Sequence, residues 1–245
     1  MAPSRSRPRE ASVPMARVSA MPLSSWGLSA QAPPAASRIK RLIDMSGAAA
    51  LLIITAPLWL MASALIFASS RGPVLFRQER VGLNGRPFTM FKFRSMWNGV
   101  SADPHRSFVR TMVRRPSDGG ATNGDGAVYK LASDSRTTTV GRWLRRTSLD
   151  ELPQLINVLR GDMSLVGPRP ALAYEVEDYE SWQFERLTVR PGMTGAWQVA
   201  DRYRMPYYEM CRMDVDYIRN WSIRRDISIL LRTPAAMLNR DGGGR

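Results

Sequence analysis

The segment from Met45 to Ser70 constrains this chain more than any other feature, because it carries no charge and includes the run LLIITAPLWLMASALIF. A helix of this length can cross the hydrocarbon core of a bilayer, which is about 30 Å thick. The alternative is a buried helix in a soluble core, although such helices are seldom this long without a charge. We therefore expect a membrane helix.

Pro57 lies near the middle of this segment, where proline removes one backbone hydrogen bond and bends a helix. Both flanks are basic, so the rule that keeps positive charge in the cytoplasm selects neither orientation. If both flanks are cytoplasmic, the segment enters one leaflet, bends at Pro57 and returns, and Thr55 can satisfy a backbone group at the bend. The residues alone leave a straight crossing open. The flanking cations are Arg38, Lys40, Arg41, Arg71, Arg77 and Arg80.

The composition predicts an anionic partner. The 245 residues include 35 Lys+Arg and 21 Asp+Glu, a net charge of +14, and 44% are hydrophobic, which excludes a fully disordered chain. Only Lys40, Lys92 and Lys130 are lysines, so arginine carries nearly all the positive charge, and arginine binds phosphate through paired hydrogen bonds. Anionic lipid, nucleic acid and nucleotide all fit this charge.

Cys211 and His105 are the only residues of their types. A single cysteine cannot form an internal disulfide, and a single histidine excludes metal sites that need two histidines from one chain. The cysteine count also argues against a zinc or iron–sulfur site. Catalysis by this chain must therefore depend on carboxylates, hydroxyls and cations.

Composition divides the chain into four parts. We expect a disordered, proline-rich basic arm over 1–37, a membrane helix over 38–72, a compact domain over 73–238 and a flexible tail over 239–245. The domain mixes strand-like and helical patterns, which predicts a helix-rich α/β fold.

Local patterns place several elements inside the domain. Apolar runs at 74–76 and 88–93 predict strands, and leucines at helical spacing predict a helix over 149–160 that ends at Gly161. The glycine-rich stretch 97–127 is typical of an irregular insertion. A basic amphipathic pattern over 215–232 fits a helix on a membrane surface and ordinary domain packing equally well.

Asp150 and Glu151 are adjacent at the start of the predicted helix. One interpretation is structural, because Ser148 and Glu151 have the spacing of a capping box and acids suit the positive end of a helix. The other is catalytic. One carboxylate can attack phosphorus while its neighbour holds a magnesium ion that bridges phosphate oxygens. Arg145 and Arg146 just before the pair, and GPRP just after, supply cations that neutralise a transferring phosphoryl group.

The motifs together resemble the bacterial sugar transferase family. They are Lys40-Arg41 before the proline-broken segment, then GPVLFRQERVGLNGRPFTMFKFRSM, TSLDELPQLINVLRGDMSLVGPRP and RPGMTGAWQV. The resemblance covers about residues 38–238 and points to the monotopic polyprenyl-phosphate sugar-1-phosphate transferases of the exopolysaccharide-initiating type.

This resemblance implies a magnesium-dependent ping-pong reaction. The donor is a UDP-sugar, UDP-glucose or UDP-galactose, and the acceptor is polyprenyl (undecaprenyl) phosphate. The implied nucleophile is Asp150, and Glu151 is the implied magnesium ligand. Phosphate-handling positions match Lys92, Arg94, Arg145 and Arg169, and positions linked to nucleotide binding or to the surrounding architecture match Arg202, Asp214 and Asp226.

The resemblance also implies a location and partners. The membrane segment becomes a re-entrant hairpin that bends at Pro57, and the catalytic domain lies at the cytoplasmic face of the bacterial inner membrane with interfacial amphipathic helices. Its partners are the two substrates, inner-membrane lipid and the downstream glycosyltransferases of the pathway, with no nucleic acid.

The sequence departs from the family at Ala200-Asp201-Arg202, where relatives often have a glycine, at Ala56-Pro57, where they often have Ser-Pro, and in the long insertion. These departures bear on donor choice and efficiency more than on the reaction. Two other classes of protein stay open: a membrane-tethered nucleic-acid-binding protein, suggested by the charge, and a family member that acts only in assembly. The intact acid pair argues against the second.

Overall fold

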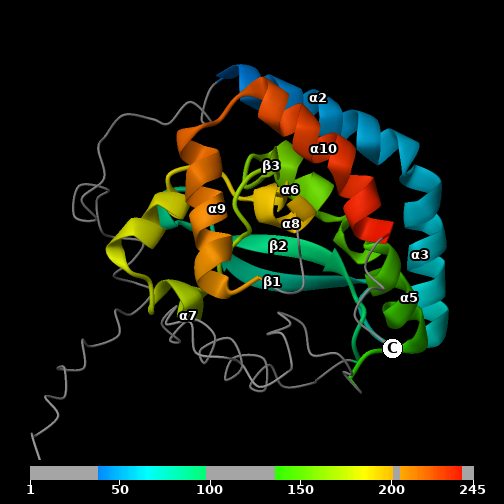
Figure 1. Cartoon of the computed structure of the whole chain (residues 1–245). Helices are drawn as coiled ribbons and strands as arrows, with labels where there is room; N and C mark the ends of the chain where they lie inside the picture. Colours follow the sequence, from blue (N-terminus) through cyan, green and yellow to red (C-terminus); the bar gives the residue numbers. More distant parts are fainter. Residues whose placement is uncertain (1–37, 98–135, 201–204, 239–245) are drawn as a thin grey trace, which may run out of the picture.

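The computed structural model describes residues 38–97, 136–200 and 205–238. These residues form a helix-rich α/β fold, as the sequence predicts (Figure 1). The predicted arm over 1–37, the tail over 239–245, Arg202, His105 and all of the 97–127 insertion after Trp97 lie outside the described residues.

The apolar segment forms two helices with a sharp bend between them. Helix α2 (Arg38–Ile54) and helix α3 (Ala56–Ser69) meet at 61° across Thr55. Pro57 lies in the first turn of α3, where its missing N–H is tolerated, and the Thr55 hydroxyl donates to the Leu51 carbonyl at 2.7 Å. The bend predicted at Pro57 is therefore present. The Leu51 carbonyl already accepts the Thr55 N–H, so the Thr55 hydroxyl does not satisfy the Ile53 carbonyl that Pro57 leaves without its helical donor.

Most of this bent pair does not pack into a core. In α3 only Ala62 and Ile66 are buried, whereas Leu60 and Phe67 are each 76% exposed. This argues against the buried-helix alternative. No single helix of the described residues is long and apolar enough to cross a membrane, and the bent pair meets that requirement only as a pair.

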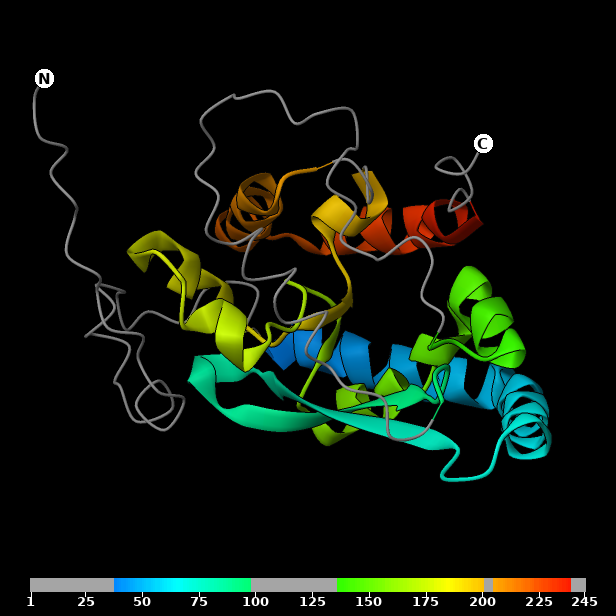
Figure 2. The same ribbon diagram turned by 90° about the horizontal axis from the view of Figure 1, so that it is seen from below.

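A long antiparallel hairpin crosses the middle of the molecule in Figure 1 and lies along its lower side in Figure 2. Strands β1 (Leu75–Val81) and β2 (Pro87–Phe93) pair from Leu75↔Phe93 to Val81↔Pro87, and the 3-10 turn η3 (Leu83–Gly85) joins them. Both predicted strands are confirmed. Phe93 packs edge-on against Trp59, with ring centroids 5.2 Å apart, so one end of the hairpin is fixed to α3.

The segment after the second gap departs from the predicted single helix over 149–160. Helix α5 (Thr139–Thr147) ends at Ser148 in a left-handed conformation with φ 58°, a 3-10 turn η4 (Leu149–Glu151) follows, and α6 (Gln154–Arg160) begins only after Pro153. A continuous helix would place the Pro153 ring against the Leu149 carbonyl, which explains the break. The Ser148 side chain makes no capping bond, so the predicted capping box is absent here. Gly161 ends α6 with φ 93°, as predicted.

A second, parallel sheet of two short strands builds the main core. Strands β3 (Ser164–Val166) and β4 (Gly192–Thr194) pair beneath α2, α6 and α10 (Ile223–Leu238). Helix α8 (Ala196–Ala200) belongs to this core through Ala196 and Val199, and α9 (Tyr207–Arg219) adds Tyr217 and Ile218. The remaining elements are α7 (Ala173–Val176), which contacts β1, and η5 (Ser181–Leu187), which contacts α9.

Helix α10 keeps an apolar stripe in contact with water. Ile227 is 50% and Leu231 76% exposed, whereas Ile229 is buried in the main core. Helices α2 and α10 both run along the upper side of the molecule in Figure 1. The amphipathic pattern over 215–232 is divided between the end of α9 and α10. One face of α10 packs into the domain and the other is exposed, so domain packing is confirmed for the first face and a membrane surface stays a prediction for the second.

Candidate active site

A cationic pocket lies where β2, η4, β4 and the loop between β3 and α7 meet. The loop, residues 167–171, is called the GPRP loop below. Three side chains predicted from sequence share the pocket: Lys92, Glu151 and Arg169. The full lining is Arg80, Met90, Lys92, Glu151, Gln154, Arg169, Pro170, Gly192, Met193 and Gln198. Three cations around one carboxylate make a site suited to a polyphosphate.

The acid pair is positioned by the turn between α5 and α6. Because Ser148 turns the chain in a left-handed conformation, η4 lies against both α5 and β2. Glu151 forms an ion pair with Lys92, with 3.3 Å between Lys92 Nζ and Glu151 Oε1. Asp150 is 7% exposed and lies next to this pair in the same turn. A non-glycine residue with positive φ beside two carboxylates is typical of a strained functional site.

Backbone contacts hold the GPRP loop against β4. The Gly167 N–H donates to the Thr194 carbonyl at 2.9 Å, and the Gly192 N–H donates to the Pro168 carbonyl at 2.8 Å. A Cβ on Gly192 would lie 2.1 Å from the Gly167 nitrogen, so this approach requires glycine. Arg80 adds a hydrogen bond of 3.0 Å to the Pro170 carbonyl.

A buried ion pair lies beneath the same loop. Arg186 donates to Asp214 Oδ2 through Nε at 3.0 Å and Nη2 at 2.9 Å, and its Nη2 also faces the Arg169 carbonyl at 3.4 Å. Burial raises the pKa of Asp214 to about 6, although Arg186 and the nearby backbone N–H of Arg169 pull the pKa down. Tyr179 and Tyr207 complete the cage by accepting hydrogen bonds from Arg186.

Arg94 and Arg145 lie outside the pocket lining, at the end of β2 nearest to α3. Arg94 is 6% exposed and donates through Nη2 to the Ser70 carbonyl at 2.7 Å and to Ser70 Oγ at 2.8 Å. Arg145 donates through Nε to Ser95 Oγ at 2.9 Å. These two predicted residues therefore do not line the pocket: Arg145 lies on α5, which contacts η4, and Arg94 directly follows β2.

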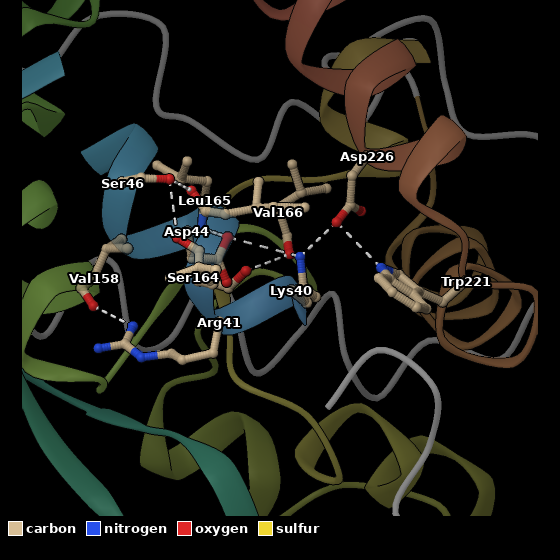
Figure 3. Close-up of polar contacts among 12 residues, drawn as sticks. Lys40, Arg41, Asp44, Ser46, Val158, Ser164, Leu165, Val166, Trp221 and Asp226 are labelled. Carbon is tan, nitrogen blue, oxygen red and sulfur yellow. Dashed lines mark hydrogen bonds and ion pairs between the residues drawn. The ribbon is translucent and has the colours of Figure 1, made fainter. Parts of the chain in front are cut away.

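Asp226 lies in a separate buried network that ties α2 to α10 (Figure 3). Lys40 Nζ lies 2.7 Å from Asp226 Oδ2 and 3.8 Å from Asp44 Oδ1. Asp226 also accepts a hydrogen bond of 3.1 Å from Trp221, and Asp44 accepts one of 3.0 Å from the Leu165 backbone N–H. Asp226 thus anchors the first helix to the core and, like Asp214, does not line the pocket.

Sequence reasoning did not single out Arg80, Arg186 or Gln198 as site residues. Arg80 was noted only as a flanking cation, and nothing local distinguishes a buried arginine in a chain so rich in arginine. The charge count carries no information on burial, and only the fold places these side chains at the GPRP loop or in the pocket.

The described residues contain no group of three histidine, cysteine or acidic side chains placed to hold a metal ion. Glu151 is the acidic residue that lines the pocket. Magnesium in phosphate-binding sites is usually held by one or two carboxylates together with substrate phosphates and water. A single carboxylate in a pocket for phosphates therefore fits an ion that arrives with its substrate.

Comparison with known proteins gives consistent matches. Residues 35–240 match the family model for bacterial sugar transferases. The chain is 38% identical to the exopolysaccharide production protein ExoY of Rhizobium meliloti (strain 1021), over 84% of this chain and 89% of that protein. It is 42% identical to the UDP-glucose:undecaprenyl-phosphate glucose-1-phosphate transferase of Caulobacter vibrioides, over 82% of this chain and 70% of that protein.

A third relative is much longer than the matched region. The undecaprenyl-phosphate galactose phosphotransferase of Salmonella typhimurium is 39% identical over 83% of this chain, and the match covers 41% of that protein. The match therefore covers less than half of that relative.

Proposed function

This chain belongs to the bacterial sugar transferase family, and we propose that it transfers a hexose 1-phosphate from a UDP-hexose to undecaprenyl phosphate. Enzymes named for UDP-glucose and for galactose are both among its relatives, so glucose and galactose are the first candidates for the sugar. The proposed role is the first step of exopolysaccharide synthesis, which supplies downstream glycosyltransferases. The observation that carries the proposal is the acid pair beside a pocket lined by Arg80, Lys92 and Arg169.

In the proposed first half-reaction, a carboxylate oxygen of Asp150 attacks the phosphorus that bears the sugar. A bond forms between that oxygen and phosphorus, the bond to the bridging oxygen of the diphosphate breaks, and UMP leaves with the electron pair. Lys92 and Arg169 neutralise charge on the diphosphate as it divides. In the second half-reaction, an oxygen of the carrier phosphate attacks the same phosphorus and releases the Asp150 carboxylate.

The proposal includes Mg²⁺, with Glu151 as its protein ligand. When bound, the ion would supply positive charge that stabilises the negative charge developing on the transferring phosphate. Lys92, 3.3 Å from Glu151, would orient this carboxylate and contact the same phosphates. A pocket with one carboxylate and three cations supports an ion held jointly with the substrate.

We also propose that the bent pair α2–α3 enters one leaflet and returns, so that both ends stay at the cytoplasmic face of the inner membrane. Pro57 in the first turn of α3 and the exposed apolar side chains of the pair support this arrangement. The exposed stripe of α10 and the basic surface would add membrane contact, at about 1 kcal/mol for each cation near anionic lipid.

The test is the release of UMP from a panel of UDP-sugars, with magnesium and undecaprenyl phosphate, by purified protein in lipid or detergent. We expect release with one donor, and Asp150→Asn should abolish it. Asp216→Asn is the matched control, because Asp216 is an exposed carboxylate paired with Arg225 outside the pocket. Folded protein that releases no nucleotide from any donor, beside an active relative, would reject the proposal and favour a role in assembly only.

A further inference from the structure

The guanidinium of Arg94 is buried but only partly satisfied. Its Nη2 makes the two hydrogen bonds to Ser70, whereas Nε and Nη1 are buried with no hydrogen-bond partner among the described residues. A buried cation with unused donors costs stability unless an anion or another acceptor completes it. Arg94 therefore has the burial and the open hydrogen-bonding capacity of an anion-binding group.

The position of Arg94 points to an anion that comes from the membrane side. Ser70, which accepts the hydrogen bonds from Arg94, is the C-cap of α3. It marks the point where the chain leaves the bent pair α2–α3 and enters the rest of the domain. On the adjacent residue of β2, Phe93 packs against Trp59 and Ile66 of α3. An anion at Arg94 would thus lie at the base of the apolar segment, where a lipid headgroup would reach the protein in the proposed membrane arrangement.

Arg94 directly follows β2, the strand that contacts the turn carrying the acid pair, and lies outside the donor pocket. Lys92 lies in β2, and Arg94 directly follows the last residue of this strand, where its N–H still donates to the Val74 carbonyl. If the extended backbone continues through Arg94, the two side chains leave the same face about 7 Å apart. Lys92 contacts Glu151 in the pocket, and η4, which carries Asp150, packs against β2. Lys92 and Arg94 can therefore bind two different phosphates, one in each half-reaction.

From this arrangement we propose that Arg94 forms the subsite for the phosphate monoester of the lipid carrier, while Lys92 and Arg169 serve the diphosphate of the donor. This inference rests on the proposed function. In the step that Arg94 serves, an oxygen of the carrier phosphate forms a bond to the sugar-bearing phosphorus on Asp150. The bond between phosphorus and the Asp150 oxygen breaks, and the electron pair returns to the carboxylate. Arg94 neutralises and orients the attacking phosphate.

The experiment measures the two half-reactions separately. Without carrier, the enzyme should release about one UMP per chain in a burst, and carrier-dependent turnover reports the second step. Arg94→Gln should raise the KM for undecaprenyl phosphate at least tenfold and slow the burst less than twofold. Lys92→Gln, two residues away on the same strand face, should give the opposite pattern, with a slower burst and a higher KM for the UDP-sugar.

A second variant keeps the test decisive if Arg94→Gln does not fold. Ser70→Ala removes one of the two bonds that hold Arg94 and leaves the other, to the backbone carbonyl. It should show the same selective rise in the KM for carrier, about twofold to fivefold. Arg94→Lys keeps the charge but loses the paired donors, and should recover part of the loss.

Three results would overturn the inference. The first is an equal loss in both half-reactions in folded Arg94→Gln, which would assign Arg94 to the donor or to the framework. The second is an unchanged KM for carrier. The third is a loss of binding to anionic vesicles with no change in that KM, which would assign Arg94 to bulk phospholipid. A wild-type enzyme that shows no burst and no turnover would instead reject the proposed function itself.

Discussion

Replacing Asp214 with asparagine tests whether the buried ion pair beneath the pocket holds Arg169 in position. Asp214 does not line the pocket. Its carboxylate reaches the GPRP loop through Arg186, which faces the Arg169 carbonyl, and through the nearby backbone N–H of Arg169. Asparagine keeps the size of the side chain and one acceptor oxygen but removes the charge that orients Arg186. The expected effect on catalysis is therefore indirect and depends on Arg169.

The size of the effect follows from these contacts. Hydrogen bonds to charged groups contribute about 1.5–3 kcal/mol each, and removing one partner of a buried pair costs about 3–5 kcal/mol. If about 2 kcal/mol of this cost appears as misplacement of Arg169, kcat/KM for the UDP-sugar falls about 30-fold. The remainder should appear as lower thermal stability.

A double-mutant cycle provides the assay. In the background of Arg169→Ala, the further change Asp214→Asn should reduce kcat/KM only about twofold, because the side chain that it positions is gone. Asp226→Asn is the matched control: it also removes a buried carboxylate paired with a cation, but it anchors α2 and not the GPRP loop. Asp226→Asn should therefore reduce kcat/KM by the same factor in the wild-type and Arg169→Ala backgrounds.

The pH dependence of kcat/KM tests the ion pair between Asp214 and Arg186 independently. Since burial raises the pKa of Asp214 to about 6, the carboxyl is charged above this pH and neutral below it. The advantage of wild type over Asp214→Asn should be full at pH 8 and should disappear as the pH falls through about 6. The reasoning is refuted if Asp214→Asn causes the same fold-loss in both backgrounds, or if the ratio of wild type to variant does not change with pH.

Four further predictions follow from the fold and the site. Burial raises the pKa of the Cys211 thiol to about 11, so maleimide should label it at pH 7.5 only after denaturation. Gly192→Ala places a Cβ 2.1 Å from a backbone nitrogen of the GPRP loop and should lower stability by about 3 kcal/mol, measured as Tm, with loss of UMP release. Lys40→Met should cost about 3 kcal/mol because it leaves buried Asp226 without its cation, and adding Asp226→Asn should restore part of the Tm. Chelation of divalent ions should abolish UMP release, and Mg²⁺ should restore it; full activity in excess chelator would contradict the role given to Glu151.

The sequence predicts the elements whose signals are local. The apolar run at 88–93 predicts β2, Pro57 predicts the bend, and Gly161 predicts the end of α6. It also selects the acid pair, Lys92 and Arg169 as a site, and the fold brings Lys92, Glu151 and Arg169 into one pocket. The element predictions that the structure confirms depend on properties that a residue carries with it, such as a fixed φ or a missing side chain, whereas the chemical role of the site residues stays a prediction.

The failures concern properties that arise only between distant segments. The leucine spacing over 149–160 predicts a continuous helix, but Pro153 and the left-handed Ser148 divide it and so direct the acid pair toward β2. The bond between Lys40 and Asp226 joins residues 186 positions apart, and no local pattern announces it. For the same reason, the sequence cannot show that Arg94 contacts Ser70 at the end of α3 while Lys92, two residues before it, lines the pocket.

The covalent intermediate is the most direct test of the central claim. Wild-type protein is incubated with its UDP-sugar and magnesium without carrier, quenched, and analysed by intact and peptide mass spectrometry. The account predicts one hexose phosphate per chain on the peptide that contains Asp150, its discharge on addition of undecaprenyl phosphate, and its absence in Asp150→Asn. Turnover by Asp150→Asn, or turnover by wild type with the adduct on another residue, would contradict the account.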